Sequence, residues 1–217
     1  MTAPAVMTEL TTLLFNQFVT WHNQGYASPS PDAVRHAVRA RNGAANAIWL
    51  ETASGSGDTT LLLSTQGRLV VGIERNRDRF QQAVARFPEG SPVRLFHAHS
   101  LRALPKLLPQ LVGNVNFWLA GHHAAAITAA IARTTEVPAE PGDGEDDVQS
   151  ILLELAEIGH HLRQYSQVAV MVDGVRFFDP ANADYPEFPT LDLLVDWART
   201  NDLMWHVEHD IFIARNF

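Results

Sequence analysis

Short apolar runs alternate with predicted helices through the middle of the chain. The apolar runs cover residues 47–50, 69–73, 93–96, 115–119 and 168–172. Helical patterns lie between them, over residues 59–63, 77–87, 101–111, 123–133 and 151–164. Buried strands that alternate with helices predict an α/β fold, with a doubly wound, mostly parallel sheet that has helices on both faces.

The two ends of the chain complete this pattern. Apolar residues at helical spacing predict an amphipathic opening helix over residues 8–21, and Asp32 is expected to cap a second helix that runs to Arg41. After a further predicted helix over 190–199, residues 204–208 and 211–214 flank the short turn His209–Asp210, which indicates an antiparallel hairpin. We therefore predict a seven-stranded sheet with an antiparallel final strand. It belongs to one globular unit over residues 46–217, preceded by an N-terminal helical cap over residues 1–45.

The composition is typical of a globular protein. Of the 217 residues, 46% are hydrophobic and 18% are charged, a balance that suits one domain with a hydrophobic core. Cysteine is absent, which excludes disulfides, thiolate nucleophiles and cysteine zinc sites. The N-terminus has no basic segment before its apolar residues, and no apolar run approaches the roughly 20 residues that span a bilayer. We therefore expect a cytoplasmic protein that does not bind membranes.

The charge balance argues against a nucleic-acid partner. Sixteen lysines and arginines against 24 acids leave a net charge of −8, whereas phosphate recognition depends on clustered positive charge. Arg35, Arg39 and Arg41 are the candidates for a local basic patch, but we interpret them as the solvated face of a helix.

An acidic segment rich in proline and glycine covers residues 134–147. It has no periodicity, so we predict a surface loop between two helices. A lid over the substrate is the alternative, because long loops at strand ends often control access to a site.

A glycine-rich loop follows the first predicted strand, with the sequence ETASGSGDTT over residues 51–60. Gly55 and Gly57 let the backbone turn sharply and bring its amides close to a ligand. Asp58 or Thr59 is expected to cap the next helix. An ordinary turn is the alternative for a loop of this composition.

Glu74 ends the second predicted strand, about 20 residues after the loop begins, where an acid can accept hydrogen bonds from two ribose hydroxyls. The loop and this acid together indicate a cofactor that contains adenosine, although a solvated strand-end acid is the alternative. The loop lacks the G-x-G-x-x-G pattern of NAD sites and begins with the acidic Glu51. These features favour S-adenosylmethionine, whose positively charged amino and sulfonium end Glu51 would approach.

From Trp49 to Ile213 the sequence resembles the class I methyltransferase-like proteins related to the macrocin-type O-methyltransferases. The matching motifs, in the order found in that family, are Glu51–Thr52 with Gly57–Thr60, Ile73–Glu74, His97–Ser100, Phe117–His123, Ile151–Leu155 and Val172–Arg176. The resemblance implies S-adenosylmethionine as the cofactor. It also implies these cofactor-binding residues: Glu51, Ala53, Ser54, Gly55, Gly57, Asp58, Thr59, Glu74, Arg75, His99 and Ser100.

The sequence departs from this family at two glycines and at three acids. Ala53 replaces a glycine, Ala98–His99 replaces Gly-Asp, Ala120 replaces the acid of the fourth strand, and Gly174 replaces the second acid of the fifth strand. In related methyltransferases the third-strand acid approaches the adenine, and the later acids can hold a divalent metal beside the acceptor hydroxyl. His99 can still stack on the adenine or bond to it. Only Asp173 remains of the metal-binding acids, so we predict no tight magnesium site.

Methyl transfer needs an aligned acceptor and a base whose pKa lies near neutrality. His122 or His123 is the predicted base, Asp173 would orient it or bond to the acceptor, and Arg176 would anchor the substrate. Two alternatives remain. These groups can be strand-end polar residues satisfied by backbone and water, or the two histidines and Asp173 can bind a softer metal.

We therefore predict an S-adenosylmethionine-dependent methyltransferase with a small-molecule acceptor, acting by O-methylation without tight magnesium. The alternative is a non-catalytic or repurposed methyltransferase-like domain that binds S-adenosylmethionine or a metabolite. An NAD-dependent oxidoreductase fits the loop less well. Phe15 and Phe18 on the opening helix would either form a homodimer contact or pack over the cofactor.

Overall fold

Seven strands form one sheet, in the order β3-β2-β1-β4-β5-β7-β6, in the computed structural model, which describes residues 15–23, 30–120, 146–181 and 188–217. The strands are β1 (Ile48–Thr52), β2 (Leu69–Glu74), β3 (Val93–His97), β4 (Gly113–Leu119), β5 (Tyr165–Asp173), β6 (Met204–Glu208) and β7 (Ile211–Arg215). Strands β1 to β5 are parallel, and β7 runs antiparallel to both β5 and β6. The predicted doubly wound sheet and its closing hairpin are confirmed.

The helices of the described residues are α2 (Asp32–Asn42), α3 (Asp58–Ser64), α4 (Arg77–Arg86), α5 (Ser100–Leu107), α7 (Asp146–His161) and α8 (Leu191–Thr200). Three short 3-10 turns are η1 (Leu108–Gln110), η2 (Leu162–Gln164) and η3 (Val175–Phe178). Residues 15–23 are helical and so overlap the predicted opening helix, which was expected to end at residue 21. None of these helices is long and apolar enough to cross a bilayer.

Two sequence predictions lie wholly or mostly outside the described residues. They are the helix over residues 123–133 and the acidic loop over residues 134–147. The end of that loop prediction is wrong, because Asp146 and Asp147 already belong to α7.

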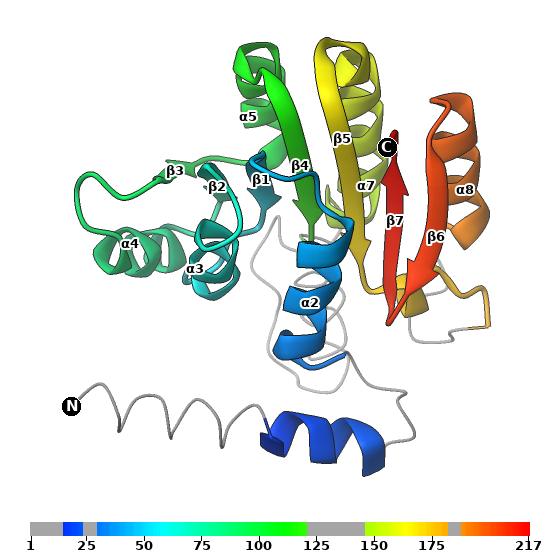
Figure 1. Cartoon of the computed structure of the whole chain (residues 1–217), viewed down its shortest axis with the longest axis horizontal. Coiled ribbons are helices and arrows are strands. Elements are labelled where there is room, and N and C mark those ends of the chain that lie inside the picture. The colour runs from blue at the N-terminus through cyan, green and yellow to red at the C-terminus, as the bar shows by residue number, and fades with distance from the viewer. Residues whose placement is uncertain (1–14, 24–29, 121–145, 182–187) are drawn as a thin grey trace.

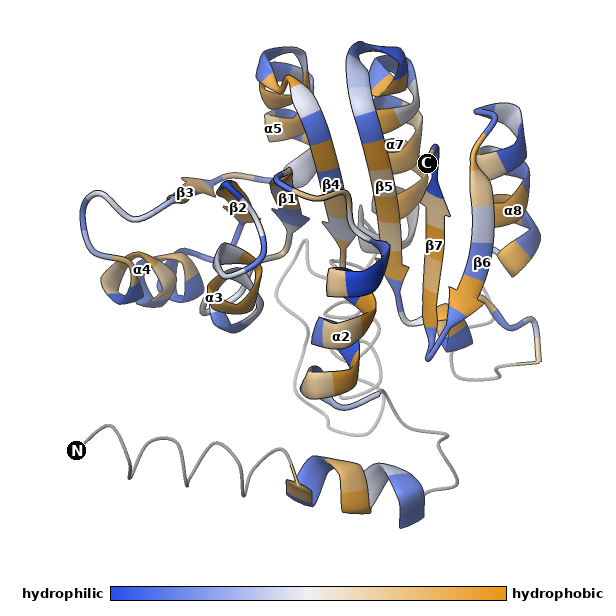
Figure 2. Ribbon diagram, viewed as in Figure 1, coloured by the Kyte–Doolittle hydropathy of each residue, from blue (hydrophilic) through white to orange (hydrophobic). Residues whose placement is uncertain are grey.

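Successive side chains along each strand point to opposite faces of the sheet, so the core is divided into two layers. On one face, Leu50 and Phe117 pack with apolar residues of α5, α7 and α8. On the other face, Trp49 and Trp118 pack with Val38 of α2 and with α3. Both tryptophans are buried, as the sequence predicts for core residues. Figure 2 shows that β5 and β7 are mainly apolar, consistent with strands covered on both faces.

The strand order reverses between β1 and β4, at the centre of the sheet. From β1 the chain proceeds through β2 and β3 to one edge, and it then returns to β4 and β5 on the other side. In open parallel sheets this switch point leaves a crevice beyond the carboxyl ends of the strands, where ligands bind. Figure 1 shows that the arrowheads of β4, β5 and β6 point the same way. They point toward the end of the strands at which α2 begins.

Two predicted helix caps are wrong. Pro31 precedes α2, so Asp32 is its first helical residue and not a side-chain cap. Gly57 precedes α3 with a left-handed backbone, φ 89°, which places Asp58 inside the first helical turn. An acid in a first turn still interacts favourably with the helix dipole. Asp58 also pairs with Arg86, whose hydrogen bond lowers the pKa of Asp58.

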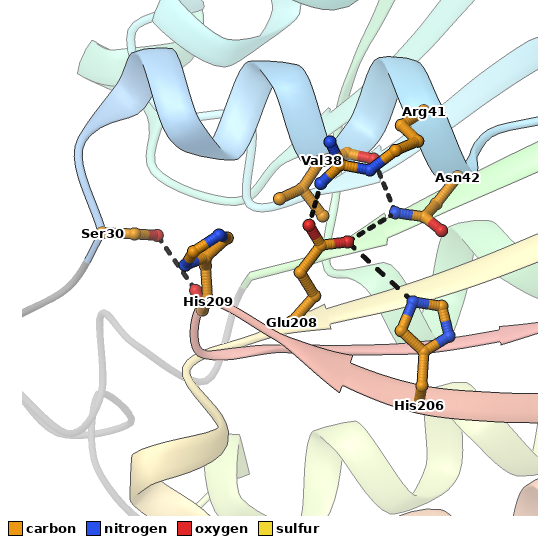
Figure 3. A network of polar contacts seen from close by, with 7 residues as sticks. All are labelled: Ser30, Val38, Arg41, Asn42, His206, Glu208 and His209. Carbon is orange, nitrogen blue, oxygen red and sulfur yellow. Dashed lines mark hydrogen bonds and ion pairs between the residues drawn. The ribbon is translucent and has the colours of Figure 1, made fainter.

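A polar network joins α2 to the β6–β7 hairpin (Figure 3). Glu208 accepts a hydrogen bond from Asn42 Nδ2 at 3.1 Å and pairs with Arg41. Nearer the start of α2, Ser30 Oγ donates to the carbonyl oxygen of His209 at 3.1 Å. These contacts hold both ends of α2 on the hairpin.

Candidate cofactor-binding site

The glycine-rich loop connects β1 to α3 at the central switch point. Ala53, Gly55 and Gly57 all adopt left-handed backbone conformations, with φ of 55°, 56° and 89°. Ser54 N donates to the carbonyl oxygen of Ile73 at 3.0 Å, which fastens the loop to β2. A Cβ atom added at Gly55 would meet nothing within 4 Å. The loop backbone is therefore held against β2, and there is open space on the side of Gly55 where a side chain would lie.

Glu74 binds this loop directly. Its Oε2 accepts a hydrogen bond from Gly55 N at 2.7 Å, and its Oε1 accepts one from Asn76 N at 2.7 Å. The residue is only 4% exposed, so the alternative of a solvated strand-end acid is wrong. Each carboxylate oxygen has two acceptor positions, so each keeps capacity for one more hydrogen bond.

Glu51 lies buried in the sheet layer beside the loop. It is 2% exposed, and its Oε2 accepts a hydrogen bond from Thr60 Oγ1 at 2.6 Å. Burial raises the pKa of Glu51 to about 7, although the Thr60 bond and the charge of Arg39 both oppose this rise. Sequence reasoning missed Thr60 as a partner, although it is the last residue of the loop motif. The predicted approach of Glu51 to a sulfonium group stays a prediction.

The arginines of α2 do not form the solvated face that we expected. Arg39 is 2% exposed, and its guanidinium lies 4.4 Å from the centre of the Trp118 ring. Burial lowers the pKa of Arg39 to about 10, while nearby acids raise it. Arg35 pairs with Asp173, and only Arg41 is well exposed. Positions 35, 38, 39 and 42 share one helix face, and this face rests on the sheet.

Asp173 at the end of β5 and Arg176 in η3, both predicted for catalysis, are each paired within the protein. Asp173 forms an ion pair with Arg35 of α2. Arg176 forms an ion pair with Asp210, whose Oδ1 also accepts a hydrogen bond from Arg176 N at 2.8 Å. The Asp210 carbonyl oxygen accepts a hydrogen bond from Gly174 N at 2.8 Å. The β6–β7 turn is thereby fastened to the carboxyl end of β5.

The carboxyl end of β3 carries two histidines with fixed rings. His99 Nδ1 accepts a hydrogen bond from the backbone amide two residues later at 3.3 Å and so caps α5, whose first residue is Ser100. In the neutral form His99 therefore carries its proton on Nε2. His97 Nε2 lies 3.0 Å from the Arg75 carbonyl oxygen, and its ring stacks on Phe80 at 5.2 Å. Sequence reasoning missed this stacked pair.

The structure thus places the predicted cofactor residues in two neighbouring groups. The loop residues 53–59 lie with Glu51 and Glu74 at the ends of β1 and β2, and Arg75, His99 and Ser100 lie at the ends of β2 and β3. His122 and His123 are outside the described residues, so their catalytic role stays a prediction. Within the described ranges, no three histidine, aspartate or glutamate side chains gather as metal ligands would.

Replacing Ala53 by glycine is expected to stabilise the protein by about 0.5–1 kcal/mol. A left-handed backbone costs a residue with a Cβ atom roughly 1–2 kcal/mol, and the extra freedom of glycine in the unfolded chain offsets part of the gain. Urea unfolding of Ala53→Gly measures the change. Ala45→Gly is the control, because Ala45 is exposed and has no positive φ. An equal loss of stability in both variants would contradict the prediction.

Comparison with known proteins supports the architecture. No family model matches the chain, and no curated protein matches it in sequence. A Streptococcus mutans protein assigned as a methyltransferase and solved with S-adenosylhomocysteine matches with a TM-score of 0.50 and 11% identity, over 87% of this chain and 97% of that one. A Clostridium thermocellum protein assigned as an rRNA methylase matches with a TM-score of 0.50 and 9% identity, over 83% and 93% of the two chains. At such identities the likeness concerns the fold: this chain has the Rossmann-like fold of class I methyltransferases.

Proposed function

We propose that this protein binds S-adenosylmethionine at the glycine-rich loop and transfers its methyl group to a small molecule. The observation that carries the proposal is the contact between Glu74 and Gly55 N, which holds an acid and a glycine backbone together at the switch point. The Streptococcus mutans protein, which shares the fold, was solved with S-adenosylhomocysteine. The macrocin-type relationship and O-methylation belong to this proposal as its more specific part.

The residues at the loop fit an adenosyl group. Ser54 Oγ is buried and has no hydrogen-bond partner among the described residues. Glu74 retains acceptor capacity on both oxygens, and Gly55 borders open space. A ribose has two adjacent hydroxyls, each able to donate and accept. Such a group would satisfy Ser54 Oγ and use the remaining acceptor positions of Glu74.

When bound, the cofactor supplies a methyl group made electrophilic by a positively charged sulfur. The protein would contribute mainly by holding the acceptor in line with this group. Asp173 and Arg176 lie at the carboxyl end of β5, on the acceptor side of the switch point. The net charge of −8 favours a small acceptor over a nucleic acid. His122 or His123 remains the proposed base.

A second function is favoured by one observation. The candidate acceptor-binding residues at the end of β5 and in η3 are held in ion pairs inside the protein, Asp173 with Arg35 and Arg176 with Asp210. A domain that binds the cofactor or a metabolite without transferring methyl would keep such pairs closed. Turnover separates the two functions, because both require cofactor binding and only the first produces S-adenosylhomocysteine.

Calorimetric titration with S-adenosylhomocysteine tests cofactor binding, and the Gly55→Val variant tests whether the cofactor binds beside the loop. Valine would fill the open space beside the loop, so affinity is expected to fall by about 50-fold or more, roughly 2.3 kcal/mol. Gly90→Val is the matched control, since Gly90 also has a positive φ, 86°, and open space around it. Equal affinity in the two variants would contradict the proposed site. Release of S-adenosylhomocysteine with hydroxyl acceptors then tests for transfer.

A further inference from the structure

Asp173 lies where β5 and the neighbouring strand β4 end side by side. Alternation along β5 places it on the sheet face of Ala169 and Met171, the face that α2 covers. Ala120 follows β4 on the same face, and the pairing of Leu119 with Val172 sets it beside Asp173 on the neighbouring strand. At these adjacent strand ends, the carboxylate of Asp173 therefore lies beside the methyl side chain of Ala120.

This arrangement does not fit a divalent metal. Magnesium requires several oxygen ligands, and the single carboxylate of Asp173 is 3% exposed and already paired. Its partner is the guanidinium of Arg35, which reaches down from α2 and is 18% exposed. The positive charge that a buried carboxylate needs is thus supplied by the protein itself.

The Arg35 guanidinium also has a donor to spare. Its Nε is buried and has no hydrogen-bond partner among the described residues. One helical turn further along α2, Arg39 lies over Trp118, two residues before Ala120 on the same face. The guanidinium groups of Arg35 and Arg39 therefore lie between α2 and the ends of β4 and β5.

We propose that Arg35 is the resident cation of the acceptor side, in place of a divalent metal. It fixes Asp173 and presents an N–H donor to the oxygen of an acidic acceptor, such as a phenol or a carboxylic acid, because a guanidinium favours the ionised form of such groups. The proposal rests on the proposed methyl transfer and adds the chemical class of the acceptor. Arg35 acts here as a positioning residue for Asp173 and as a ligand to the acceptor.

Manganese binding, followed by electron paramagnetic resonance, tests whether Arg35 takes the place of a metal. Ala120→Asp alone is expected to bind Mn²⁺ weakly, because Arg35 still pairs with Asp173. Arg35→Gln/Ala120→Asp places two carboxylates side by side without the Arg35 charge and should bind Mn²⁺ about 10-fold more tightly or better. Arg41→Gln/Ala120→Asp is the control, since Arg41 lies on the same helix but pairs with Glu208. Mn²⁺ binding to the unchanged protein, or equal binding in the two double variants, would overturn the proposal.

A second measurement uses the protein without a new carboxylate and so does not depend on the folding of the double variant. 4-Nitrophenolate is the probe, titrated into the protein with and without EDTA. Binding is expected in both conditions, and Arg35→Gln should weaken it about 10-fold while Arg35→Lys retains part of it. Absence of probe binding, or a loss of binding in EDTA, would overturn the proposal. Neither measurement needs S-adenosylmethionine, so failure of the proposed function would be seen separately, as absent cofactor binding.

Discussion

Glu51→Gln is expected to stabilise the protein by about 3 kcal/mol at pH 8 and by no more than about 1 kcal/mol at pH 5. The side chain is fully buried, and burial raises its pKa from an ordinary 4.5 to about 7. Between these two values the folded protein keeps a proton that the unfolded chain releases. Stability contributed by Glu51 therefore falls as the pH rises through this window and is constant above it. Glutamine removes the charge and keeps an oxygen that accepts the Thr60 hydrogen bond.

Urea unfolding at pH 5 and pH 8 measures this effect as the difference between variant and unchanged protein. The difference matters because burial lowers the pKa of His36 and His206 from an ordinary 6.5, so both histidines also make stability depend on pH. A lowered histidine pKa makes stability rise with pH, which opposes the Glu51 effect. Glu89→Gln is the control, because Glu89 is exposed. A pH-independent difference for Glu51→Gln would show that another group is responsible.

An ionisable group that reduces stability at neutral pH calls for a functional reason. Proteins commonly retain such groups where activity requires them, and strongly shifted pKa values concentrate at functional sites. Glu51 borders the glycine-rich loop through Thr60, and the charge of Glu74 reaches it. If Glu51 approaches the positive end of the cofactor, Glu51→Gln should gain stability and lose affinity for S-adenosylmethionine together.

Glu74→Ala is expected to weaken S-adenosylhomocysteine binding by about 100-fold or more and to destabilise the fold by about 3 kcal/mol. The carboxylate accepts hydrogen bonds from Gly55 N and Asn76 N, each at 2.7 Å. Hydrogen bonds to charged groups contribute about 1.5–3 kcal/mol each, and alanine would leave both amides without their partner. The loop would lose one of its attachments to β2, with the bond from Ser54 N to Ile73 remaining, and the ribose would lose its acceptor.

Calorimetry and urea unfolding of the same preparations separate the two effects. Glu74→Gln retains one acceptor oxygen, so an intermediate loss is expected in both measurements. Glu89→Ala removes an exposed acid and should leave both unchanged. Full affinity in a folded Glu74→Ala protein would remove the central support for the proposed cofactor site.

The strands could be predicted because their signal is local. The apolar run of Val168 to Val172 needs two covered faces wherever it lies, and β5 contains it entirely. The hairpin was equally accessible, since the short turn His209–Asp210 separates residues 204–208 from residues 211–214. Both turn residues adopt positive φ in the structure, 47° and 68°. The helix caps failed because proline and glycine at positions 31 and 57 set the backbone entry in place of a side chain.

Chain order and apolar pattern were sufficient for the sheet and the position of the glycine-rich loop, because these features depend on neighbouring residues and on which strands must be buried. Spatial proximity decided the rest. From the sequence we interpreted Arg35 and Arg39 as solvated charges. In the fold, the packing of α2 against β4 and β5 places Arg35 beside Asp173 and Arg39 over Trp118. The near-neutral pKa of Glu51 likewise arises from burial, which outweighs the opposing charge of Arg39 on another element. Charges interact through space, over distances that only packing establishes, so a linear pattern does not contain them.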